Sequence, residues 1–101
     1  MTKDAKQVDP VEPAATVELN QPVVVHGEEV SFLEFREPTS KDILALGTPM
    51  TFTADGDVRV DMGVVGKYIV RLAGVNAKSL ETMSRRDLMS CTQVVNGFFQ
   101  Q

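Results

Sequence analysis

The stretch that decides the fold is Phe32-Leu33-Glu34-Phe35-Arg36-Glu37-Pro38-Thr39-Ser40-Lys41-Asp42, which holds the end of a strand and the start of a helix. Leu33 and Phe35 flank one polar residue and therefore share a face of the strand. Pro38 has no N–H to donate to a sheet and ends that strand. Thr39 is expected to cap the following helix, with Asp42 completing a capping box.

Upstream of this junction, residues 16–36 read as a β-hairpin. Its turn is supplied by His26-Gly27-Glu28-Glu29, in which the glycine is free to take a positive φ. Pro22 interrupts the first arm and predicts an edge strand or a bulge there. The apolar pattern of the second arm changes phase near Phe32, which a bulge or partial cover of both faces would explain.

Downstream, residues 40–46 predict a short helix that ends at Gly47. Residues 48–60 are ambiguous and form either an open loop or a second short hairpin. The hairpin alternative depends on Asp55-Gly56-Asp57, which is a strong turn signal between two brief alternating arms. Such short arms would be marginal in isolation.

A longer helix is predicted from Met62 to Ala73, with Asp61 as its N-cap and Gly74 beyond its end. One apolar stripe runs along it, made of Val65, Tyr68, Ile69 and Leu72.

The last helix is predicted to start at Ser84, after a turn at residues 77–82. Ser84 and Asp87 have the spacing of a second capping box. The main stripe of this helix consists of Leu88, Cys91, Val95 and Phe98. The predicted fold class is therefore α+β: an N-terminal β-hairpin followed by a small helical domain of about three helices, with a possible second short hairpin.

The 101 residues suffice for one small domain. Residues 1–15 are expected to be a flexible acidic tail rich in Pro and Ala, and residues 16–101 a single domain. Residues 1–40 contain eight acidic and three basic side chains, whereas residues 41–101 contain six and seven. An acidic arm is either a solvated face or a contact for a basic partner.

Bulk properties exclude several classes of function. The formal net charge is −4 and the pI is near 4.8, which disfavours nucleic-acid binding. No apolar run is long enough to span a membrane, and the N-terminus does not read as a secretory signal. Cys91 has no second cysteine to pair with, which fits a reducing cytoplasm.

No catalytic, cofactor-binding or metal-binding residues are expected. His26 is the only imidazole and is predicted to be a solvated turn residue. Cys91 lies on an apolar stripe, where a free cysteine packs as a small hydrophobe. Asp55 and Asp57 lack the further oxygen ligands of a calcium loop. We therefore expect a binding protein and not an enzyme.

Phe98 and Phe99 are the residues most suited to a partner. Adjacent helical side chains diverge by about 100°, so a small domain cannot easily bury both. Either both complete the core, or one of them, together with Val95 on the same helix, contacts a partner or a second copy.

The chain resembles the Mu-like phage tail assembly chaperones over residues 16–100. The resemblance rests on Val17 to Gly27, on Leu33 to Ile43 with its Arg36-Glu37-Pro38-Thr39 segment, on Leu72-Ala73-Gly74 and on the closing Phe98-Phe99. Arg36 and Glu37 belong to the most specific motif. Their alternative role is structural, with Arg36 pairing with a carboxylate and Glu37 capping the strand-to-helix turn.

This resemblance implies a non-enzymatic assembly factor of a phage or prophage. Such proteins act in the host bacterial cytoplasm, bind and solubilise the tape measure protein during tail morphogenesis, and are absent from the mature virion. A frameshifted longer form implies a contact with the tail tube protein. Homo-oligomerisation, a small structural tail or baseplate subunit, and a regulatory protein-binding module stay open as alternatives.

Overall fold

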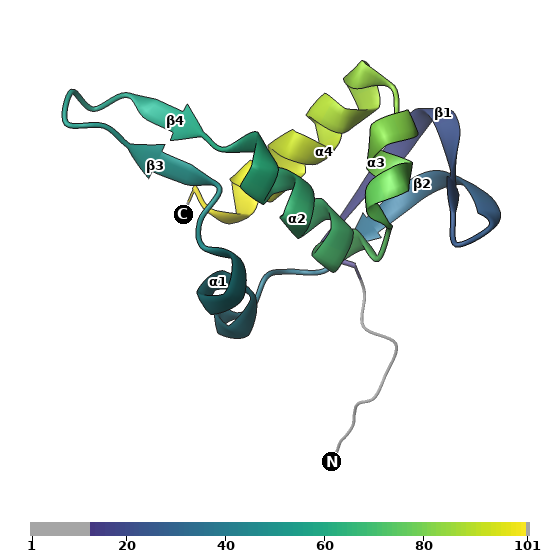
Figure 1. The fold of residues 1–101 in the computed structure, drawn as a ribbon, viewed down its shortest axis with the longest axis horizontal. Helices are drawn as coiled ribbons and strands as arrows, with labels where there is room; N and C mark the ends of the chain where they lie inside the picture. The colour runs from purple at the N-terminus through teal and green to yellow at the C-terminus, as the bar shows by residue number, and fades with distance from the viewer. Residues whose placement is uncertain (1–12, 101) are drawn as a thin grey trace, which may run out of the picture.

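The computed structural model describes residues 13–100, which form two antiparallel hairpins and four helices (Figure 1). The predicted α+β class is confirmed, including the second short hairpin. Residues 1–12 of the predicted tail lie outside the described residues, and Ala15 already belongs to the first strand. The elements are β1 (Ala15–Val25), β2 (Glu28–Phe35), α1 (Ser40–Leu46), β3 (Met50–Phe52), β4 (Val58–Val60), α2 (Met62–Ala73), α3 (Ala77–Thr82) and α4 (Arg85–Phe98).

A bulge of four residues interrupts the β1–β2 hairpin. Glu18 pairs with Phe32, but the next pair is Val23 with Val30, so residues 19–22 of β1 lie opposite Ser31 alone. The bulge predicted at Pro22 is therefore present, and it also explains the change of phase near Phe32. At the other end, His26 and Gly27 both take positive φ angles in the turn.

The core lies between the β1–β2 hairpin and the two longer helices, α2 and α4. The hairpin contributes alternate side chains from one face, and the predicted stripe of α2 is entirely buried. The fully or nearly fully buried apolar residues are Val17, Val23, Leu33, Phe35, Val65, Tyr68, Ile69, Leu72, Val75, Met83, Cys91 and Val95.

Asp87 joins the bulge of β1 to the start of α4. Its Oδ1 accepts hydrogen bonds from the Asn20 backbone N–H and side-chain amide, both at 2.8 Å. Its Oδ2 accepts from the Gln21 N–H at 3.1 Å. A capping box was predicted between Ser84 and Asp87, and one half of it is present: the Ser84 hydroxyl accepts a hydrogen bond from the Asp87 N–H. The Asp87 side chain, which would form the other half, binds the bulge. The Asp87 carboxylate binds the bulge because the bulge leaves backbone donors unpaired in the sheet.

Residues 77–82 form helix α3, so the prediction of a turn there is wrong. Asn76 caps this helix, since its side-chain oxygen accepts a hydrogen bond from the Ser79 N–H at 2.9 Å. Ser79 is fully buried and its hydroxyl donates to the Val24 carbonyl at 2.7 Å. The helix is therefore stabilised against β1 by a tertiary hydrogen bond that has no local sequence signal.

The β3–β4 hairpin extends away from the body of the molecule (Figure 1). Met50 pairs with Val60, and Phe52 pairs with Val58. At its base, Pro49 is buried and its carbonyl accepts from the Asp61 N–H at 2.8 Å. At its tip, Gly56 has a φ of 88°, as the Asp-Gly signal predicts. No helix among residues 13–100 has the length and apolarity needed to cross a bilayer.

We expect Asp87→Ala to lower the free energy of unfolding by about 1.5–3 kcal/mol, because three hydrogen bonds to a buried carboxylate are lost together. Ser84→Ala, which removes only the cap of the same helix, should cost about 1 kcal/mol. Urea denaturation followed by circular dichroism measures both values. Equal losses for the two variants would show that the carboxylate acts only on its own helix.

Candidate partner-binding surface

A groove of about 780 Å³ opens between α1, α2 and α3. Its lining is mainly apolar, and small residues keep its floor low: Gly63 and Gly66 of α2 have no side chain to fill it. A groove of this kind suits the apolar face of an amphipathic helix. The lining residues are Ala45, Leu46, Met62, Gly63, Gly66, Lys67, Val70, Arg71, Ala77, Leu80 and Glu81.

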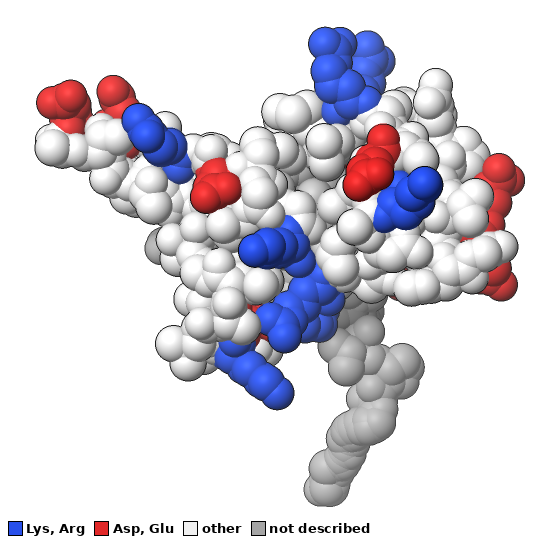
Figure 2. Space-filling view, in the orientation of Figure 1, with Lys and Arg blue, Asp and Glu red and all other residues white. Residues whose placement is uncertain are grey.

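Basic side chains border the groove on the α2 side. Lys67 and Arg71 are four residues apart and both are exposed. Figure 2 shows lysine and arginine side chains gathered over α1 and α2, and acidic side chains at the ends of the two hairpins, near the start of α2 and over α3. On the α3 side, Glu81 also lines the groove. A partner helix with acidic residues along the side that faces α2 therefore complements this surface.

The position of α1, one wall of the groove, is set by an ion pair. Arg36 Nη1 donates to Asp42 Oδ2 at 2.8 Å, and Nη2 donates to Oδ1 at 3.3 Å. Asp42 also accepts from the N–H and hydroxyl of Thr39, which completes the predicted capping box. The strand end and the helix start are thus fixed to each other through one carboxylate.

A second basic side chain ties this carboxylate to α2. Arg71 Nε lies 3.4 Å from Asp42 Oδ1, and Arg71 itself lines the groove. The Arg36 hydrogen bonds, followed by that from the Thr39 backbone, hold the pKa of Asp42 well below its usual range. The carboxylate is 3% exposed and remains charged at neutral pH, so the α1 wall is held through both arginines.

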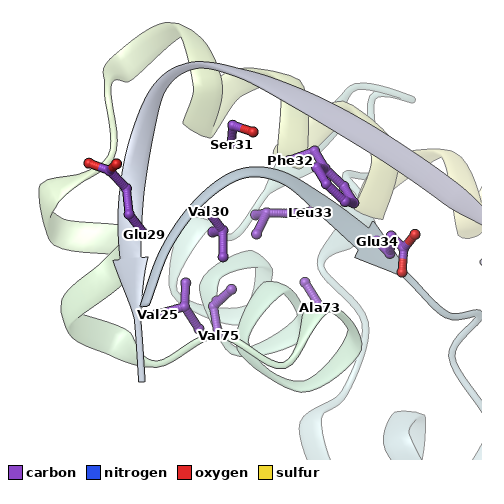
Figure 3. Close-up of a pocket in the computed structure, with 9 residues that line it drawn as sticks. All are labelled: Val25, Glu29, Val30, Ser31, Phe32, Leu33, Glu34, Ala73 and Val75. Atoms are coloured by element: carbon purple, nitrogen blue, oxygen red, sulfur yellow. The ribbon is translucent and has the colours of Figure 1, made fainter. Parts of the chain in front are cut away.

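A second hollow, of about 410 Å³, lies against the β1–β2 hairpin (Figure 3). Val25, Val30 and Val75 gather on its inner side, while Glu29 and Glu34 lie at its margins. Carboxylates at both margins make this hollow more polar than the groove. It is therefore less suited to an apolar helix.

The predicted partner residues at the C-terminal end are mainly part of the core. Val95 is fully buried and does not reach the surface. Phe98 and Phe99 are both partly buried against the core, and the Phe99 ring meets Tyr68 edge-on with centroids 5.2 Å apart. Two roles were considered for these phenylalanines, completing the core and contacting a partner. The structure shows both side chains packed against the core.

Arg36 has the structural role foreseen for it, since it pairs with Asp42. Glu37 does not have its foreseen role, because Thr39 is the N-cap of α1 and the Glu37 side chain is exposed. Only the backbone carbonyl of Glu37 takes part, as an acceptor from Arg36 Nη1 at 3.1 Å.

The residue types that most often carry metal or nucleophilic chemistry lie apart in the described residues. Among residues 13–100 no three metal-ligating side chains gather at one place. Burial raises the pKa of the Cys91 thiol to about 11, which keeps it protonated and unreactive at neutral pH. His26 is exposed in its turn, with Nε2 3.1 Å from the Gly74 carbonyl oxygen.

A known family matches residues 16–100 and is described as phage tail assembly chaperone proteins, E, or 41 or 14. The chain belongs to this family. The resemblance seen in the sequence is thereby confirmed over the same residues. No curated protein and no solved structure matches the chain.

The sequence reading of this tail assembly chaperone missed the groove. Its α3 wall, with Ala77 and Leu80, fell in the segment predicted as a turn. Asn76, a strong N-cap residue directly before that segment, was the available signal. The groove itself is formed by three separate helices, and no pattern within one helix reveals how the three are placed.

We expect the stability of this chaperone to fall as the pH drops below about 4, where unfolded carboxylates begin to bind protons. Asp42 has a lowered pKa in the folded chain, so its contribution is complete above the unfolded pKa and is lost toward the folded one. Urea denaturation at pH 7 and pH 3 measures this loss. Asp42→Asn should be less stable at pH 7 and should show a smaller change between the two pH values; an unchanged pH dependence would exclude this carboxylate as a source.

Proposed function

We propose that this tail assembly chaperone binds and solubilises the tape measure protein by holding its amphipathic helices in the α1–α2–α3 groove. The family supports a role in tail assembly. The tape measure protein is a long partner with apolar helical surface, and the chaperone covers that surface until the tail tube encloses it. No chemical step is required, so the protein is not an enzyme.

The observation that carries this proposal is the groove itself. It combines an apolar lining with basic side chains on one border. Its α1 wall is held to α2 by the Asp42 ion pairs, and its α3 wall is held to β1 by the Ser79 hydrogen bond. Because the walls are fixed before binding, little ordering entropy is lost when a helix enters. Helix-in-groove binding reads apolar residues at spacings of three and four, which recur along a long helical partner.

The length of the partner also fits a small chaperone. Copies bound to the same tape measure chain are at a high effective concentration relative to one another. A modest affinity of each groove for its helix is then sufficient to cover the partner. We place this activity in the host bacterial cytoplasm and expect the chaperone to be released before the virion is complete. A longer frameshifted form would add the contact to the tail tube protein.

We expect Met62→Glu to abolish solubilisation of the co-expressed tape measure protein. Met62 lines the groove and is 44% exposed, so a carboxylate there places charge in the apolar lining without disturbing the core. It also lies at the start of α2, where a negative charge suits the helix dipole. The measurement is the soluble fraction of tape measure protein and its co-purification with the chaperone.

Met89→Glu is the matched control, because Met89 is 49% exposed on α4 and lies outside the groove lining. It should leave the soluble tape measure fraction unchanged. Loss of solubilisation with Met89→Glu but not with Met62→Glu would move the binding surface to α4. A tape measure protein that stays insoluble beside the wild-type chain would contradict the proposed function itself.

A further inference from the structure

The β3–β4 hairpin is a two-stranded sheet with both edges free. Among residues 13–100 no further strand pairs with either β3 or β4. Two strands of three residues each are marginal alone, and the hairpin stands away from the body of the molecule (Figure 1). A free edge offers a row of N–H and C=O groups to another strand.

The hydrogen-bond register shows which groups each edge offers. The Thr53 N–H donates to the Asp57 carbonyl at 2.8 Å, and the Asp61 N–H donates to the Pro49 carbonyl at 2.8 Å. Bonded and non-bonded pairs alternate in an antiparallel ladder, so Thr51 and Arg59 form the bonded pair between them. The backbone groups of Met50 and Phe52 therefore point outward from the β3 edge.

Charge distinguishes the two edges. Strand β4 has Arg59 at its centre, so two β4 strands paired about that residue would place like charges opposite each other. Strand β3 is Met50-Thr51-Phe52 and has no charged residue. In a two-fold interface the residue at the axis meets its own copy and every other contact occurs twice, so a charge at the axis meets a like charge. This favours an uncharged edge for contact between copies.

We propose that β3 pairs antiparallel with β3 of a second copy of this chain, with Thr51 opposite Thr51 at the two-fold axis. Met50 of each copy then exchanges both backbone hydrogen bonds with Phe52 of the other. The threonines meet at a non-bonded position, where side chains are closest, and Thr–Thr and Met–aromatic neighbours are both favourable. The result is a four-stranded sheet, β4–β3–β3–β4.

The side chains of the hairpin support this pairing. Thr51 and Arg59 share one face, so the other face is made of Met50, Phe52, Val58 and Val60. Phe52 is 74% exposed, Val58 50% and Val60 39%. Edge pairing covers part of this apolar surface by placing each Phe52 beside the other copy's Met50. It also links two molecules without using the groove, so the inference does not depend on what the groove binds.

The interface is small, because each copy contributes one three-residue edge, well below the roughly 800 Å² per partner of stable complexes. Self-association is therefore weak and depends on concentration. It becomes effective where copies are already held near each other.

Sedimentation equilibrium of the full chain up to millimolar concentration tests the proposal, with circular dichroism to confirm that each variant is folded. Thr51→Glu should raise the dimer dissociation constant about five-fold or more, since two like charges then meet at the axis. In the monomer the same carboxylate faces Arg59 across the ladder and supports the hairpin. An equimolar mixture of Thr51→Glu and Thr51→Lys chains should associate about as well as the wild type.

Arg59→Gln is the matched control on the other strand and should leave the dissociation constant unchanged. Stronger association of Arg59→Gln would show that β4 is the pairing edge and would overturn the proposal. A wild-type chain that is monomeric at every concentration would also overturn it. The proposal would also be overturned if Thr51→Glu associated as strongly as the wild type. In that case the contact between copies lies elsewhere, or the β3 edge binds only the tape measure protein.

Discussion

A two-stranded sheet is only marginally stable in water, so the β1–β2 hairpin depends on the helices that cover one of its faces. Helices α2 and α4 supply this cover, with Tyr68, Ile69, Cys91 and Val95 fully buried against the strands. The bulge at residues 19–22 leaves the ladder incomplete at one point. The Asp87 carboxylate satisfies the exposed donors there, and thereby fixes α4 on the sheet.

The same constraint distinguishes the two hairpins by their packing. The first hairpin is covered and belongs to the core, whereas no further strand among residues 13–100 pairs with either edge of β3–β4. Between them, Asp42 ties α1 to the end of β2 through Arg36 and to α2 through Arg71, and this positions the α1 wall of the groove. The most specific motif of the sequence therefore places a wall of the proposed binding surface, and under this proposal its residues need not touch the partner.

Local signals predicted the fold well and the surface poorly. Thr39, Asp61 and Gly74 marked helix ends correctly because capping depends on nearby residues. Helix α3 was missed because its contact, Ser79 with Val24, spans distant residues. Asp87 was expected to complete a capping box, but a carboxylate at that position can bind another segment instead, here the bulge of β1. Val95 was expected to contact a partner, but an apolar stripe does not show which of its residues reach the solvent, and Val95 is buried. The groove could not be predicted, because it is lined by three helices whose relative positions the sequence does not give.

The central claim is that a helix of the tape measure protein occupies the α1–α2–α3 groove. Hydrogen exchange followed by mass spectrometry, on the chaperone alone and in its complex with the tape measure protein, tests this most directly. Added protection is expected in α1, in α2 and at the start of α3, with little change in the last turn of α4. Protection confined to the α4 end around Phe98 and Phe99, with none along the groove, would contradict it.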